Sequence, residues 1–155
     1  HGNCFAGKHM SFGLAFNNYI KSTRRVRVRR TADQALGAQV PVTWTVVDFD
    51  TASFFNAGTP TFLTIPITGL YFVVVWLPSR TVTPYELRCY RNVFATGTIF
   101  DYFPGVGNPN AASAASASML FEFTAGDQVA IASPNAITYG NSAGFRPMLS
   151  IASTS

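Results

Sequence analysis

The most apolar segment of the chain lies near its centre, from Leu70 to Leu77, and is rich in β-branched and aromatic residues. Thr68-Gly69 precedes it and Pro78 follows it, so turn signals bound the segment on both sides. Eight such residues between turns are typical of a strand that is buried on both faces, although periodicity alone also allows a buried helix. We predict a central strand.

A shorter strand is expected just before the central one, from Thr61 to Ile65, with Pro66 to Gly69 as the turn between them. The two would form a hairpin-like pair. Because the second strand of this pair needs protein on both sides, the pattern predicts either two packed sheets or an interface between subunits.

Residues Arg25 to Thr31 alternate between valine and arginine, with Val26 and Val28 on one face. This period of two predicts a half-buried strand with a row of arginines on its outer face.

The rest of the pattern also favours short strands separated by turns, and no long amphipathic helix is expected. Strands are predicted at Val42–Asp50, Tyr85–Arg91, Met119–Thr124, Gln128–Ser133 and Phe145–Ser153, and Phe94–Pro104 is expected to be a short strand or an aromatic-anchored loop. Loops are predicted at Asp33–Pro41, Gly105–Ser118 and Asn135–Gly144. About eight short strands predict an all-β fold, either a sandwich or a jelly roll.

The first 24 residues follow neither a helical nor a strand period, yet they hold too many aromatic residues for a disordered linker. We predict an irregular N-terminal arm at 1–24, ordered by contact with another subunit, and a β domain at 25–155. Seven of the eleven Lys and Arg residues precede the first acidic residue, Asp33. A basic arm before a mildly acidic body predicts docking on an acidic partner or on a copy of the same body.

Composition narrows the classes of function. Charged residues make up 12% of the chain, against about 25% in typical soluble domains, which indicates that a partner covers much of the surface. The longest apolar run is far shorter than the roughly 20 residues of a membrane-spanning helix, so no membrane partner is expected. The arginine run matches no RNA-binding signature and the chain has only two lysines, so nucleic acid is not the expected partner.

Catalytic chemistry is hard to assemble from these residues. The histidines, His1 and His9, both lie in the arm, and with Cys4 they supply three ligands where a structural zinc site needs four. A carboxylate pair for glycoside hydrolysis could come from Asp101, Glu122 and Asp127, although single acids at strand ends are usually solvated. We expect no enzyme activity, no metal and no cofactor.

The sequence leaves open the role of two aspartates and the bonding state of two cysteines. Asp48 and Asp50 fall on the same face of a predicted strand and could begin a calcium site, or they could cap a turn through hydrogen bonds, which is commoner for Asp. Cys4 and Cys89 are two thiols or, less typically, one disulfide, because spacing alone does not fix their distance.

Four segments, in order, carry a resemblance: VRVRRTADQ, VTWTVVDFDTASFF, PTFLTIPITGLYFVVVWLPS, and MLFEFTAGDQVAIASPN with FRPMLSIAST at the end. Together they resemble the jelly-roll domain of the complement globular head and tumour necrosis factor superfamily, most closely its short versions in phage and bacterial proteins. The resemblance covers roughly Arg25 to Thr154 and implies a homotrimer packed around its inner sheet. Residues 1–24 have no counterpart in that family.

The phage-like version of the fold, the basic aromatic arm and the low charge content together favour a cement or decoration protein on the exterior of a phage capsid. Its expected partners are two further copies of the chain and the major capsid protein. The capsid-binding residues would be Phe5, Lys8, Phe12, Phe16, Tyr19, Lys21, Arg24, Arg25, Arg27, Arg29 and Arg30. The trimer and core residues would be Leu70, Tyr71, Phe72, Val73, Val74, Val75, Trp76, Phe121, Phe123, Leu149 and Ile151.

The alternative is a receptor- or glycan-binding head of a phage fibre or bacterial adhesin. Exposed loop aromatics would then contact the ligand, and the candidates are Tyr102, Phe103 and Tyr139.

Overall fold

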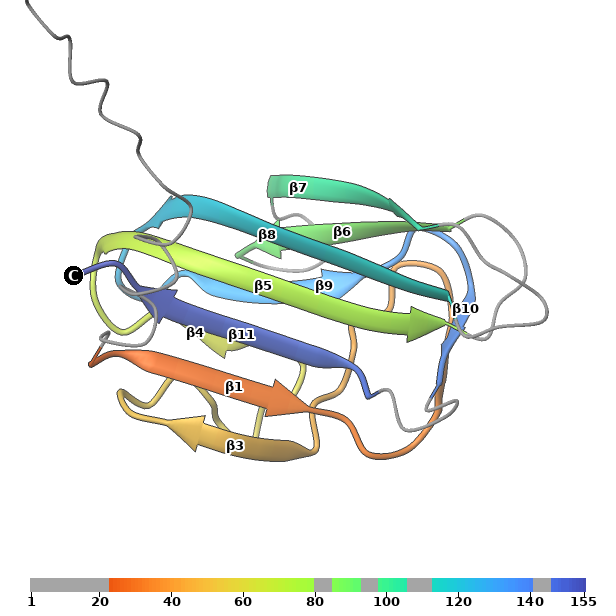
Figure 1. The fold of residues 1–155 in the computed structure, drawn as a ribbon, viewed down its shortest axis with the longest axis horizontal. Coiled ribbons are helices and arrows are strands. Elements are labelled where there is room, and N and C mark those ends of the chain that lie inside the picture. Colours follow the sequence, from red (N-terminus) through yellow and green to blue (C-terminus); the bar gives the residue numbers. More distant parts are fainter. Residues whose placement is uncertain (1–22, 80–84, 93–97, 106–112, 141–145) are drawn as a thin grey trace, which may run out of the picture.

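Eleven strands form two antiparallel sheets that pack face to face, and the described residues contain no helix (Figure 1). The structure is a computed structural model that describes residues 23–79, 85–92, 98–105, 113–140 and 146–155. No helix in these ranges is long and apolar enough to cross a membrane. The all-β jelly-roll sandwich predicted from the sequence is confirmed, while the arm at 1–22 lies outside the described residues.

The larger sheet has seven strands and lies in front in Figure 1. Its central strand, β5, pairs with β8 along one side and with β11 along the other, and β11 pairs with β1, which pairs with β3. The two short strands β2 and β10 continue the sheet at the end of β5. The bounds are β1 Arg25–Arg29, β2 Gln34–Leu36, β3 Val46–Asp50, β5 Gly69–Ser79, β8 Ser113–Phe123, β10 Ile137–Tyr139 and β11 Met148–Ser153.

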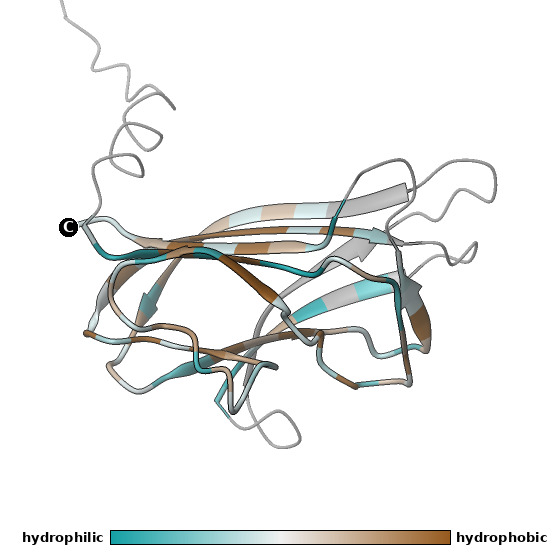
Figure 2. Cartoon of the chain, turned by 90° about the horizontal axis from the view of Figure 1, so that it is seen from below, coloured by the Kyte–Doolittle hydropathy of each residue, from teal (hydrophilic) through white to brown (hydrophobic). Residues whose placement is uncertain are grey.

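The smaller sheet has four strands in the order β4-β9-β6-β7. The bounds are β4 Leu63–Thr64, β6 Tyr85–Arg91, β7 Thr98–Gly105 and β9 Gln128–Ala132. Figure 2 shows the two sheets edge-on, with hydrophobic and polar positions alternating along the strands.

The core fills the space between the sheets. Tyr71 lies at its centre, where its ring packs against Phe54 and Phe123 with both ring centroids 6.1 Å away. Tyr71 also donates a hydrogen bond from its Oη to the Ile67 carbonyl at 2.6 Å, so this buried hydroxyl has a partner. Burial raises the pKa of Tyr71.

The prediction that Leu70–Leu77 is buried on both faces is wrong for the single chain. Tyr71, Val73, Val75 and Leu77 are buried in the core, whereas Leu70 is 43% exposed and Phe72, Val74 and Trp76 are half-buried. The reason is that nothing in the described part of the chain covers the other face of the larger sheet as the smaller sheet covers the first.

The predicted hairpin between Thr61–Ile65 and the central strand is also wrong. β4 is only two residues long and pairs with β9 in the smaller sheet, so the segment between β4 and β5 crosses from one sheet to the other. Local turn signals mark where the chain reverses, but the tertiary fold decides which strand pairs with which.

Several boundaries differ from the prediction as well. The expected loop Gly105–Ser118 contains the first half of β8, because its run of Ala and Ser lies extended against the second half of β5. Short strands β2 and β10 occupy parts of two other expected loops, and the strand expected from Val42 begins only at Val46. β6 matches its predicted range of Tyr85–Arg91.

Candidate interaction surface

The face of the larger sheet that points away from the core is called the outer face below. Side chains on this face come from alternate residues of each strand, because Val26 and Val28 of β1 and Leu149 and Ile151 of β11 point into the core. The outer-face residues are Arg25, Arg27 and Arg29 of β1, Met148, Ser150 and Ala152 of β11, Leu70, Phe72, Val74 and Trp76 of β5, and Ser116, Ser118, Leu120 and Glu122 of β8.

One half of the outer face is apolar. Phe72 lies directly between Leu120 of β8 and Ala152 of β11 in the ladder. Leu120 is 54% exposed and Leu70 is 43% exposed, which makes them two of the most exposed large hydrophobic residues of the described chain. Neighbouring exposed apolar side chains on one sheet face are typical of an interaction surface.

The other half of the outer face is cationic. Arg29 donates from its Nε to both carboxylate oxygens of Asp48, at 2.6 and 2.7 Å, and the Nε of Arg27 lies 2.9 Å from the same carboxylate. The guanidinium groups of Arg25 and Arg27 each lie 5.1 Å from the ring centroid of Phe49, a distance at which cations are attracted to an aromatic ring. The predicted outer row of arginines on β1 is confirmed, but Asp48 neutralises part of its charge.

Asp48 is held as an anion by these contacts. The hydrogen bond from Arg29 lowers the pKa of Asp48, and the charges of Arg29 and Arg27 lower it further against the opposing effect of burial. A bulge in the β1–β3 ladder between Arg27 and Val28 allows two arginines to reach one carboxylate.

Asp50 has a different role from Asp48. Its carboxylate accepts hydrogen bonds from the backbone N–H groups of Ala52, Phe54 and Phe55, at 3.2, 3.1 and 2.8 Å. The turn-capping interpretation is therefore confirmed for Asp50, whereas Asp48 pairs with arginines. Within the described ranges, no group of three or more His, Cys, Asp and Glu residues could hold a metal ion.

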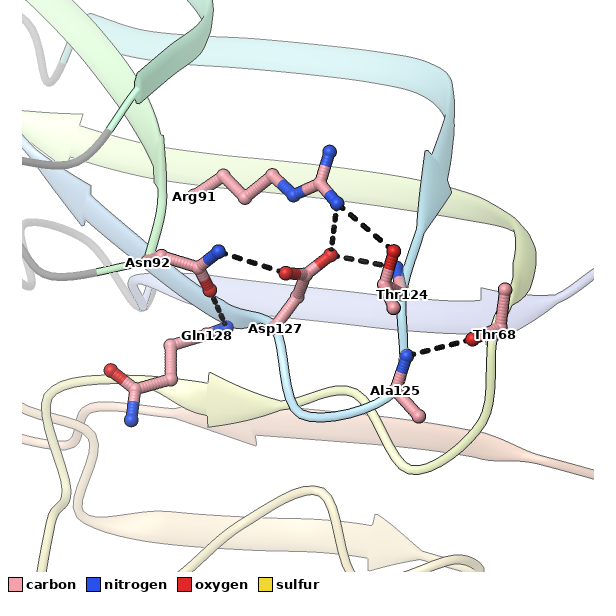
Figure 3. A network of polar contacts seen from close by, with 7 residues as sticks. All are labelled: Thr68, Arg91, Asn92, Thr124, Ala125, Asp127 and Gln128. Carbon is pink, nitrogen blue, oxygen red and sulfur yellow. Dashed lines mark hydrogen bonds and ion pairs between the residues drawn. The ribbon is translucent and has the colours of Figure 1, made fainter.

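A network of polar contacts lies at one end of the sandwich and is centred on Asp127 (Figure 3). Its carboxylate accepts hydrogen bonds from the Asn92 amide at 2.8 Å and from the Thr124 backbone N–H at 2.7 Å, and it lies 2.7 Å from the Arg91 guanidinium. The Asn92 side chain in turn accepts from the Gln128 N–H at 2.9 Å. Burial opposes ionisation, but the bonds from Arg91, Thr124 and Asn92 outweigh it and lower the pKa of Asp127.

This network joins three chain segments. Arg91 is the last residue of β6 and Asn92 follows it, while Asp127 lies in the turn from β8 to β9. Thr68, in the segment before β5, accepts from the Ala125 N–H at 3.0 Å. Both carboxylate oxygens of Asp127 have donors within the protein, so the network stabilises the corner and leaves Asp127 unsuited to acid catalysis.

The other predicted functional residues divide into three groups. Tyr139 is fully buried, so the prediction that it is an exposed ligand-binding aromatic is wrong. Of the predicted trimer and core residues, Phe123, Leu149 and Ile151 are fully buried in the core of the single chain, and Phe121 packs against this core while partly buried. The side chains of Asp101, Tyr102 and Phe103 and all residues of 1–22, including Cys4 and the two histidines, lie outside the described part.

The remaining arginines of the predicted capsid-binding set make contacts within the chain. Arg24 donates from Nη2 to the carbonyl of Ser155 at 3.0 Å. Arg30 donates to the carbonyls of Thr43 and Asp33, at 3.0 and 3.3 Å. Their first role is therefore to fix the two ends of β1 against neighbouring segments.

Comparison with known proteins identifies the fold. The chain is similar to the globular domain of zebrafish complement 1qA protein, with 16% identity, a TM-score of 0.64, and coverage of 83% of this chain and 94% of that one. It is also similar to Eiger TNF from S. frugiperda, with 11% identity, a TM-score of 0.68, and coverage of 85% and 92%. A third similar structure is murine APRIL at pH 5.0, with 13% identity, a TM-score of 0.67, and coverage of 83% and 97%.

No family model and no curated protein sequence matches the chain. At these identities the likeness concerns the fold alone. The chain therefore has the jelly-roll fold shared by the complement globular domain and the tumour necrosis factor family.

Proposed function

We propose that this chain is a non-enzymatic structural protein of a virus particle: a homotrimeric cement protein that binds and stabilises the shell of a phage capsid from outside. The observation that carries the proposal is the apolar half of the outer face. Leu70 and Leu120 expose about half of their side chains there, beside the half-buried Phe72. Burying the exposed parts of the two leucines against another copy would contribute about 1 kcal/mol each.

The basic segment supports attachment to an acidic shell. Five arginines lie between positions 24 and 30, directly after an arm that carries further lysine and aromatic residues. Guanidinium groups bind carboxylates through paired hydrogen bonds, which makes an acidic capsid surface a suitable partner. The arm at 1–24 would spread over neighbouring shell proteins while the β domains form the trimer.

The alternative function, a ligand-binding head of a fibre or adhesin, has less support. Of its three aromatic candidates, Tyr139 is fully buried and has no exposed surface with which to contact a ligand. No described residue replaces it.

Two measurements test the proposal. Light scattering coupled to size-exclusion chromatography should give three times the monomer mass of 16.8 kDa. Counting this protein in purified particles by gel densitometry should then give hundreds of copies, whereas a fibre head would give only a few.

Binding to capsids tests the arm separately. Protein lacking residues 1–24 should remain trimeric but lose capsid binding. A truncated protein that binds capsids as tightly as the intact chain would contradict the assignment of the arm, and a strictly monomeric intact chain would contradict the trimer.

A further inference from the structure

Glu122 of β8 stands out among the acidic residues because its side chain has no hydrogen bond or ion pair within the described part of the chain. It is exposed on the outer face, directly opposite Leu70 in the β5–β8 ladder. The other described acidic side chains face cations or backbone N–H groups: Asp33 faces Arg30, Asp48 faces Arg27 and Arg29, Asp50 caps a turn, Glu86 pairs with Arg88, and Asp127 pairs with Arg91.

Arg25 lies at the same end of the same face, but three strands away. The ladder runs from Leu120 of β8 through Phe72 of β5 and Ala152 of β11 to Arg25 of β1, and Glu122 follows Leu120 by one outer-face position. Figure 1 shows β5 and β11 lying between β8 and β1. Three strand spacings amount to about 14 Å, far beyond the reach of an ion pair within one chain.

The outer face therefore carries an anion on one side, cations on the other and apolar residues between them. Covering Leu70 and Leu120 with another protein surface would also take the adjacent Glu122 carboxylate out of water. A carboxylate that loses water without gaining a partner opposes association, so the covering surface needs a cation at this position. A second copy of the same face supplies one.

We propose that Glu122 of one copy pairs with Arg25 of a neighbouring copy, and that this ion pair sets the register in which the outer faces associate. The inference rests on the self-association in the proposed function and adds the contact that orients it. Arg25 is the appropriate arginine because, among the arginines of β1, it lies level with Phe72 and Leu120 in the ladder and so nearest in register to Glu122. A guanidinium placed near a ring, as Arg25 is near Phe49, can donate N–H groups from its edge to a carboxylate.

The test uses charge reversal in the full chain, with association measured by sedimentation equilibrium. Glu122→Lys and Arg25→Glu should each weaken association at least tenfold, and the double variant carrying both changes should recover most of that loss. Glu86→Gln, on the smaller sheet, is the matched control and should associate like the natural chain. Failure of the double variant to recover overturns the ion pair.

Folding is checked before association is interpreted. Glu122 is exposed and makes no described contact, so Glu122→Lys should keep the thermal stability of the isolated fold. If Arg25→Glu unfolds because it disturbs the packing on Phe49, then Arg25→Gln is used in its place. Arg25→Gln should weaken association in the natural chain but should cause no further weakening in a chain that already carries Glu122→Gln. Additive losses from these two neutral variants would overturn the pair.

A 1:1 mixture of the two single variants tests the trimer independently. In a closed ring of three, position 122 of each copy meets position 25 of the next copy. Three copies cannot alternate between two variants, so at least one contact always joins two copies of the same variant and keeps a pair of like charges. The mixture should then recover less than the double variant. Complete recovery by mixing would support the ion pair but overturn the trimer in favour of a two-fold dimer, and a natural chain that stays monomeric would overturn both.

Discussion

Replacing Asp127 with asparagine tests whether the network in Figure 3 stabilises the fold. The substitution keeps the shape of the side chain but replaces one acceptor oxygen with an NH2 group. Asp127 accepts from Asn92 through one oxygen and from Thr124 and Arg91 through the other. Whichever way the new amide turns, at least one of these donors is left unpaired, and the ion pair with Arg91 is lost.

The cost follows from burial. The Asp127 side chain is 7% exposed and that of Arg91 is 30% exposed. Water can therefore replace only part of the hydrogen bonding that the Arg91 guanidinium loses, and almost none of the hydrogen bonding that the Asn92 amide and the Thr124 N–H lose. Hydrogen bonds to charged groups contribute about 1.5–3 kcal/mol, so we expect a loss of about 2–3 kcal/mol at pH 7. For a chain of this size, that lowers Tm by roughly 4–12 °C.

Urea unfolding followed by tryptophan fluorescence measures the loss, and thermal melts followed by circular dichroism check it. Glu86→Gln is the control, because it removes an ion pair with Arg88 in which both side chains are about one-third exposed. Such pairs contribute about 0–1 kcal/mol. Equal stability of Asp127→Asn and the natural chain, or an equal loss in both variants, would refute the reasoning.

The pH dependence gives an independent check. Because the folded pKa of Asp127 is lowered, its contribution is present above the unfolded pKa and is lost as pH falls through the folded pKa. The stability gap between Asp127→Asn and the natural chain should therefore narrow below about pH 4. A gap that stays constant from pH 7 to acid unfolding would show that the carboxylate charge is not responsible.

Three further predictions concern single residues. Gly126→Ala should cost about 1 kcal/mol in urea unfolding, because the backbone has φ +89° there while an added Cβ would contact nothing within 4 Å, and an unchanged midpoint would contradict this. Asp50→Ala should cost about 2–3 kcal/mol, because three backbone N–H groups lose their acceptor, and Asp50→Asn should recover part of that loss in the same assay. Leu120→Lys should change the stability of the monomer by less than about 0.5 kcal/mol, because Leu120 is 54% exposed. The same substitution should weaken self-association measured by sedimentation. Unchanged association would argue against the outer face as the interface.

Local sequence patterns predicted those strands whose alternation directly reports burial. Val26 and Val28 alternate with arginines, and β1 is the strand that this pattern predicts, with the valines in the core and the arginines outside. The Gly-Asp turn after β8 was likewise readable, because Gly126 supplies the positive φ that most residues avoid. In both cases, the physical cause lies within a few consecutive residues.

Long-range pairing was not readable in the same way. The Ala and Ser residues at 113–118 have little strand preference of their own and become part of β8 by lying against β5. Tyr139 looked like an exposed loop residue, yet β10 places it in the core. Glu122 is one acid among several in the sequence, and only the ladder places it on the outer face, opposite Leu70.

The sequence by itself therefore determined the all-β class, the basic face of β1 and the scarcity of catalytic groups, because these depend on residue type and on alternation along one strand. Only the tertiary structure decided which face of β5 stays open and which charges share that face. Those features depend on pairing between residues far apart in the chain, and no local pattern encodes a partner 34 or more residues away, the shortest separation between paired residues of β5 with β8 or β11 (Ser79 to Ser113).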